Sequence, residues 1–206
     1  NLHSGNPRFV EAVTRAMREA CPSLGIIAEY FTDEGTLLSN VPDWRLNLVM
    51  AMPWSYKFVP QLRAYVQYLH RISDHVRYFM PITSHDSGSP AQEFGGAEST
   101  VPRYVAAALL GTGATGIVQG VECGIREKVP FIGPGVKMEW SGQARFAALL
   151  TTVNRLLAEH EAFRAGGNCQ FVDHGHDAII AAYRRNPGLC VDSTCTGPAA
   201  EGGFLV

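Results

Sequence analysis

Segments with helical apolar periodicity alternate with short, continuous apolar runs along most of this chain, and this alternation limits the possible folds more than any other feature. Runs of four to eight apolar residues are typical of strands buried on both faces, whereas apolar residues repeated every three or four positions are typical of amphipathic helices. The pattern predicts strands over residues 23–30, 44–52, 77–84 and 114–122, and helices over residues 7–20, 57–73, 98–113 and 142–163. A strand followed each time by a helix indicates an α/β fold with a parallel sheet and helical crossovers.

The character of the sequence changes near residues 165–167. Residues 166–206 read as short strands separated by turns, with no helical period. We therefore predict two domains, an α/β unit over residues 1–165 and the start of a β domain over residues 166–206. Four strand–helix units cannot close a barrel, and the last residues, GGFLV, end within a predicted strand. The sequence is therefore expected to be a piece of a longer protein.

Composition narrows the classes of partner. The 206 residues carry 17 Lys and Arg against 19 Asp and Glu, so neither nucleic acid nor a membrane surface is an expected partner. The five cysteines are odd in number and irregularly spaced, which favours reduced thiols and a cytoplasmic location. Cys190 and Cys195 could instead pair or bind a metal.

Two predicted strands end in titratable side chains. Glu29 ends one of them, and His85 with Asp86 follows another. Functional groups of parallel α/β folds lie at the carboxyl ends of strands, so these residues are expected at one rim. Carboxyl groups in different environments suit glycosidic bond cleavage, in which one protonates the leaving oxygen while another meets the positive charge on the sugar. Alternatively, Glu29 and Asp86 cap the following helices or pair with arginines.

The order of four motifs resembles the α-amylase superfamily, glycoside hydrolase family 13. GIIAEYF is similar to the family's strand-five motif, and its acid/base glutamate corresponds to Glu29. ITSHDSG is similar to the strand-seven motif, with His85 and Asp86 as counterparts and Ser84 in place of the usual asparagine. GIVQGVECG is similar to the strand-eight motif, in which Glu122 has its counterpart. NLHSGNP is similar to the residues that follow the strand-four nucleophile in debranching enzymes and some maltosyltransferases.

The resemblance implies half of a (β/α)8 barrel, from strands four or five to eight, followed by the beginning of a β-sandwich. It also implies a retaining hydrolase or transglycosylase that acts on α-glucans or maltooligosaccharides through a covalent glycosyl-enzyme. Glu29 would be the acid/base and Asp86 would stabilise the transition state, while the nucleophilic aspartate would directly precede Asn1. His3, His85 and Tyr30 would bind the sugar.

Several further expectations belong to this interpretation. Phe31 and Trp54 could also stack on sugar rings, or belong to the core. No metal site is expected from these residues, because DHGHD at residues 173–177 reads as a solvated turn. A calcium ion is common in the family, but its site would lie outside this sequence. The alternative function is a non-catalytic sugar-binding or assembly protein of the same superfamily.

Overall fold

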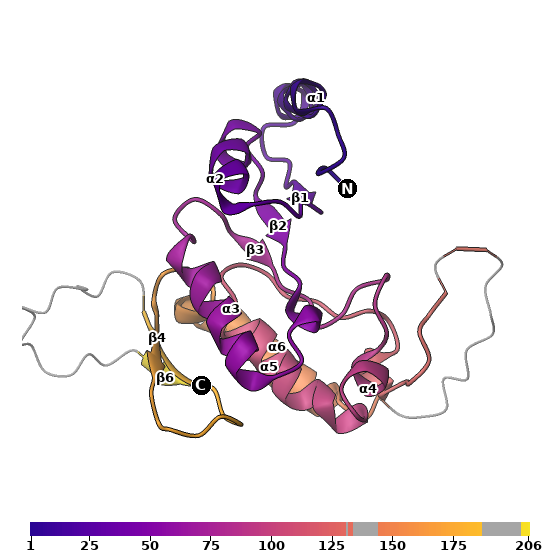
Figure 1. Cartoon of the computed structure of the whole chain (residues 1–206), viewed down its shortest axis with the longest axis vertical. Coiled ribbons are helices and arrows are strands. Elements are labelled where there is room, and N and C mark those ends of the chain that lie inside the picture. The colour runs from indigo at the N-terminus through magenta and orange to yellow at the C-terminus, as the bar shows by residue number, and fades with distance from the viewer. Residues whose placement is uncertain (131, 134–143, 187–202) are drawn as a thin grey trace, which may run out of the picture.

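The computed structural model describes residues 1–130, 132–133, 144–186 and 203–206, and within them the first architectural unit is a parallel sheet (Figure 1). Its strands β1 (Ile27–Ala28), β2 (Leu48–Met50) and β3 (Tyr78–Phe79) lie side by side in chain order. The register aligns Ala28 with Val49 and Val49 with Tyr78. The first three predicted strands are therefore confirmed, although each is shorter than its apolar run.

The fourth predicted strand, over residues 114–122, is wrong in extent. Only Ala114 pairs, in a parallel bridge to Phe79, and the chain then reaches the short 3₁₀ helix η3 (Val121–Cys123). Glycines explain the difference, because Gly120 and Gly124 on either side of η3 have φ values of 97° and 72°. Such left-handed conformations cannot continue a strand.

Helices connect the strands much as the periodicity predicts. Helix α1 (Pro7–Ala20) has the predicted bounds, and its N-cap Asn6 accepts a hydrogen bond from the Arg8 amide. Helix α2 (Glu34–Asp43) occupies the least regular link of the sequence, where Asp33 caps it by accepting from the Thr36 amide at 3.0 Å. The remaining helices are η1 (Pro53–Ser55), α3 (Val59–Arg71), α4 (Pro90–Glu93), η2 (Ala97–Ser99), α5 (Thr100–Leu109), α6 (Ala147–Glu159) and η4 (Glu161–Phe163). Helix α6 is shorter than the predicted helix over residues 142–163. It begins after Phe146 and ends before His160.

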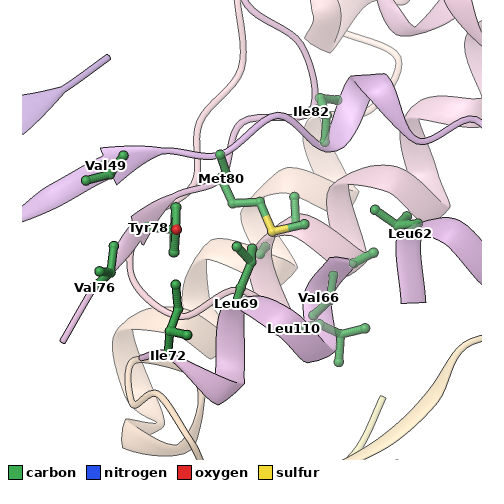
Figure 2. Packing of buried hydrophobic residues seen from close by; sticks show 14 of the residues in the cluster. Val49, Leu62, Val66, Leu69, Ile72, Val76, Tyr78, Met80, Ile82 and Leu110 are labelled. Atoms are coloured by element: carbon green, nitrogen blue, oxygen red, sulfur yellow. The ribbon is translucent and has the colours of Figure 1, made fainter. Parts of the chain in front are cut away.

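The core lies between the sheet and helices α3 and α5, as Figure 2 shows. Leu69 of α3 and Met80, directly after β3, are both fully buried. Full burial of one such side chain contributes about 2 kcal/mol. The apolar face predicted for α1 is less buried than the faces of α3 and α5. Phe9 is 68% exposed, whereas Val10 is buried.

A second, antiparallel sheet follows helix α6. It consists of β4 (Cys169–Val172), β5 (Ala181–Arg185) and β6 (Gly203–Leu205), in that order. The predicted change to short strands is confirmed, and Ala182 of β5 joins the same buried cluster as the parallel unit. The domain boundary near residues 165–167 stays a prediction. Among the described residues, no helix is both long and apolar enough to cross a membrane.

Candidate active site at the carboxyl edge of the parallel sheet

Polar side chains gather at the end of the sheet where the strands finish. Glu29 directly follows β1, and His85 and Asp86 lie on the loop after β3. Neighbouring strands are about 4.8 Å apart, so two strand spacings, about 10 Å, separate the ends of β1 and β3. The segments that carry these residues therefore leave the sheet at the same end, its carboxyl edge. The chemical roles of these residues stay predictions.

The Glu29 carboxylate is near the beginning of the chain. Its side chain is 26% exposed, and Oε2 lies 3.6 Å from the backbone nitrogen of Asn1. The Leu2 amide also donates to the Glu29 carbonyl oxygen at 2.8 Å. Asp33 is the residue that caps α2. Glu29 therefore does not have the helix-capping role that was its structural alternative.

An aromatic pair lies next to Glu29 in the chain. The rings of His3 and Phe31 have centroids 5.8 Å apart and are tilted by 33°. His3 is exposed and Phe31 is half-buried, so the pair offers part of its surface to solvent. Aromatic rings of this kind can contact the apolar face of a sugar.

Tyr30 does not belong to this surface. Its ring is 5% exposed and lies 5.2 Å from the Trp44 ring, and its hydroxyl accepts a hydrogen bond from Asn40 Nδ2 at 2.7 Å. A side chain held in the core in this way has no open face for a ligand. The prediction that Tyr30 binds sugar is therefore corrected, because Trp44 and Asn40 hold this side chain in the core. Trp54, half-buried in η1, stays a candidate.

His85 and Asp86 form an exposed pair on a loop fixed by serines. Nε2 of His85 lies 3.4 Å from Oδ2 of Asp86, and the two side chains are 52% and 57% exposed. The Asp86 amide donates to Ser84 Oγ at 3.2 Å, while the Ser84 amide donates to Ser87 Oγ at 2.8 Å. Short hydroxyl side chains often fix loops through such local bonds. Ser84, which replaces the asparagine usual in the resembling family, therefore supports the loop locally.

A second segment packs against this loop, and sequence reasoning missed it. Ser89 Oγ donates to the carbonyl oxygen of Arg126 at 2.8 Å, and Lys128 Nζ donates to the carbonyl oxygen of Asp86 at 2.7 Å. The cavity left between the loop and the segment has a volume of about 10 Å³. No local signal in the sequence marks these contacts, because they join residues 37 and 42 positions apart.

Glu122, which the sequence resemblance aligns with a strand-eight glutamate, makes a contact within its own turn. Its Oε2 accepts a hydrogen bond from the Gly120 amide at 2.7 Å, which closes the turn into η3. We therefore do not count Glu122 among the groups that face a substrate.

Metal ligands are a separate question. No cluster of three or more His, Cys, Asp or Glu residues suited to a metal ion occurs within the described ranges. His174 and His176 are exposed, and each accepts a backbone amide two residues ahead, as in a solvated turn. Cys21, Cys123 and Cys169 are thiols and not disulfides, while Cys190 and Cys195 lie outside the described residues.

Comparison with known proteins gives a structural likeness. No family model and no curated protein matches the sequence. One similar solved structure is the ligand-free form of cyclic α-maltosyl-(1→6)-maltose hydrolase from Arthrobacter globiformis, with a TM-score of 0.62. The chain shares a fold with part of this hydrolase. The match covers 88% of this chain but 44% of the hydrolase chain, at 18% sequence identity. The chain thus spans less than half of that enzyme's length.

Proposed function

We propose that this chain forms the carboxyl-terminal half of a (β/α)8 catalytic barrel in a glycosidase of the α-amylase superfamily, with residues 166–206 beginning a β-sandwich domain. The order of the sequence motifs supports the proposal, as does the fold likeness to a hydrolase named for a maltosyl-maltose substrate. Fold alone does not define chemistry, so the argument depends on the residues at the carboxyl edge of the sheet.

The observation that carries the proposal is the position of Glu29. A partly exposed carboxyl group directly after a strand of the parallel sheet can exchange a proton with a bound ligand. In the proposed reaction, Glu29 protonates the departing glycosidic oxygen and later removes a proton from water or from a sugar hydroxyl. Asp86 binds the distorted ring and stabilises its positive charge.

The proposed nucleophile is an aspartate joined to Asn1. The Leu2 amide donates to the Glu29 carbonyl oxygen at 2.8 Å, so the residues that would follow this aspartate lie beside Glu29. Retaining glycosidases place nucleophile and acid/base carboxyl groups about 5 to 5.5 Å apart, a separation within reach of one residue. Attack by that carboxylate on the anomeric carbon would give a covalent glycosyl-enzyme, and a second displacement would restore the configuration.

The proposed substrate is an α-glucan or maltooligosaccharide. His3 and Phe31 would contact a sugar near Glu29, and His85 would hold hydroxyl groups beside Asp86. Both hydrolysis and transfer fit this arrangement, since water and a sugar hydroxyl are activated by the same glutamate.

The experiment uses the full protein that carries this chain, with maltooligosaccharides as substrate. Glu29→Gln is expected to lower kcat by about 10³-fold or more while substrate binding measured by calorimetry changes little. Glu19→Gln removes the same charge from an exposed position on α1 and should leave kcat unchanged.

Proton NMR of the first products should show the α anomer. Normal turnover in Glu29→Gln would contradict the acid/base role, and sugar binding without turnover in the unmodified protein would favour the non-catalytic alternative.

A further inference from the structure

The loop that carries His85 and Asp86 is held from outside by a distant segment of the chain. Two hydrogen bonds cross between them, from Ser89 Oγ to the Arg126 carbonyl oxygen and from Lys128 Nζ to the Asp86 carbonyl oxygen. Ser89 is 7% exposed and also caps α4 by accepting from the Gln92 amide. One crossing bond is therefore anchored in the fold, while the other ends on the candidate active-site residue itself.

Close packing couples the two segments. The cavity between them, about 10 Å³, has barely the volume that one water molecule needs. Thr83, Ser87 and Ser89 line it from the loop, and Gln119 and Ile125 line it from the other segment. The Thr83 side chain is 2% exposed, and its Oγ1 is buried without a hydrogen-bond partner among the described residues. Glu127 and Lys128 line the same small space, so we expect a displacement of this segment to disturb the loop.

We propose that Lys128 is a positioning residue for Asp86. The catalytic consequence of this role rests on the proposed function. Lys128 binds the backbone carbonyl of Asp86, so its ammonium group fixes where the residue lies without occupying its carboxylate. A charged donor on a carbonyl makes a hydrogen bond stronger than a neutral one. The 2.7 Å contact therefore holds the exposed tip of the loop, where the bonds through Ser84 and Ser87 are local.

The consequence follows from what Asp86 would do in the reaction. A group that stabilises the distorted sugar acts mainly in the transition state, and small errors in its position reduce the rate more than they reduce substrate binding. Loss of the Lys128 contact is therefore expected to lower kcat and to leave KM nearly unchanged.

The test compares three variants of the full protein. Lys128→Met removes the donor, and Lys128→Arg retains a cationic donor. Lys57→Met removes the same charge from a lysine that pairs with Glu93 of α4. Lys128 and Lys57 are both exposed, so the variants should fold. We expect Lys128→Met to lower kcat about tenfold with KM within about twofold, Lys128→Arg to recover most of the loss, and Lys57→Met to behave as the unmodified protein.

Hydrogen exchange gives a readout that needs no activity. Amides of residues 84–88 should exchange at least about threefold faster in Lys128→Met than in the unmodified protein, and amides of α3 should not change. Unchanged exchange at residues 84–88 would overturn the positioning role, whether or not the protein turns over a glucan. If the exchange rises as expected but the unmodified protein lacks glucan turnover, the positioning role stands and the proposed function fails.

Discussion

The guanidinium group of Arg184 lies 3.0 Å from Nε2 of His70, although the two residues are 114 positions apart in the chain. Arg184 belongs to β5 and is fully buried, and His70 belongs to α3 and is 7% exposed. The guanidinium donates to the carbonyl oxygens of Gly111, Ala162 and Ala165 at 2.7 to 3.1 Å. Gly111 follows α5, Ala162 lies in η4 and Ala165 follows η4, and helix ends leave such acceptors unpaired. Arg184 therefore joins the antiparallel sheet to the helices of the parallel unit.

Loss of the Arg184 guanidinium should destabilise the protein. Arg184→Met keeps an apolar stem but leaves the carbonyl oxygens of Gly111 and Ala165 without their donor, while that of Ala162 still accepts from Asn168 Nδ2 at 2.8 Å. Each unsatisfied buried group costs about 1 to 3 kcal/mol. Because removal of a buried charge also recovers its desolvation cost, we expect a net loss of about 3 kcal/mol in the free energy of unfolding, measured in urea. Arg185→Met is the matched control, because its exposed Nη2 bonds to Gln170 Oε1. Equal stability of Arg184→Met and Arg185→Met would contradict the bridging role.

His70 should make stability depend on pH. Burial, with the charge of Arg184 as the next cause, lowers the pKa of His70 from its ordinary value of 6.5 to about 4. The Gly167 amide donates to Nδ1, so the neutral ring carries its proton on Nε2, which donates to the Leu110 carbonyl at 2.9 Å. The other charge that faces this ring is Arg77, which also lowers the pKa. Protonation in the folded state is therefore disfavoured.

The direction of the pH effect follows from proton uptake. Between pH 6.5 and about 4 the unfolded chain binds a proton at His70 that the folded chain does not, so stability falls as the pH falls through this window. The full contribution of His70 is about 3 kcal/mol, and it levels off below pH 4. Urea unfolding at several pH values measures the slope, and His70→Gln, which retains a donor for Leu110, should flatten it. An equal slope in both proteins would assign the effect to other groups.

Several features of the fold could be predicted from local patterns. The strands after residues 26, 47 and 77 and the bounds of α1 follow from apolar runs and from the Asn6–Pro7 cap, because these signals lie within one element. Glu29 and Asp86 could be placed at one sheet edge for the same reason. The proposed catalytic roles of Glu29 and Asp86 depend also on the residues around them, which local sequence patterns do not define.

Other features depend on contacts between distant residues. The apolar run over residues 114–122 satisfied the strand pattern, but left-handed glycines turn it into η3. Tyr30 looked available at a strand end, yet Trp44 and Asn40 of the α2 region hold it in the core. The bond from Lys128 to Asp86 joins segments that no periodicity relates.

Gly113 should not tolerate a side chain. A Cβ atom built there would lie 2.5 Å from the Tyr78 carbonyl oxygen and 2.8 Å from Cδ2 of Leu48, and the carbonyl belongs to a paired strand. Gly113→Ala is therefore expected to lower the free energy of unfolding by about 2 kcal/mol or more. Gly25→Ala, where a Cβ meets nothing within 4 Å, should change it by less than about 0.5 kcal/mol. Thermal or urea unfolding compares the two, and a well-tolerated Gly113→Ala would contradict the close approach of residue 113 to β3.

Substitutions of the neighbouring residues Tyr30 and Phe31 should have different effects. The first should lower stability, and the second should weaken sugar binding. Tyr30→Phe removes the hydroxyl that accepts from Asn40, so we expect a loss of about 1 kcal/mol in stability with KM for maltooligosaccharides unchanged. Phe31→Ala removes the ring beside His3 at the proposed sugar surface, so KM should rise about tenfold, which corresponds to about 1.4 kcal/mol of binding. Steady-state kinetics and urea unfolding of both variants separate the two effects. A higher KM in Tyr30→Phe with an unchanged KM in Phe31→Ala would reverse the assignment, and would require the Tyr30 ring to leave its place against Trp44 when the sugar binds.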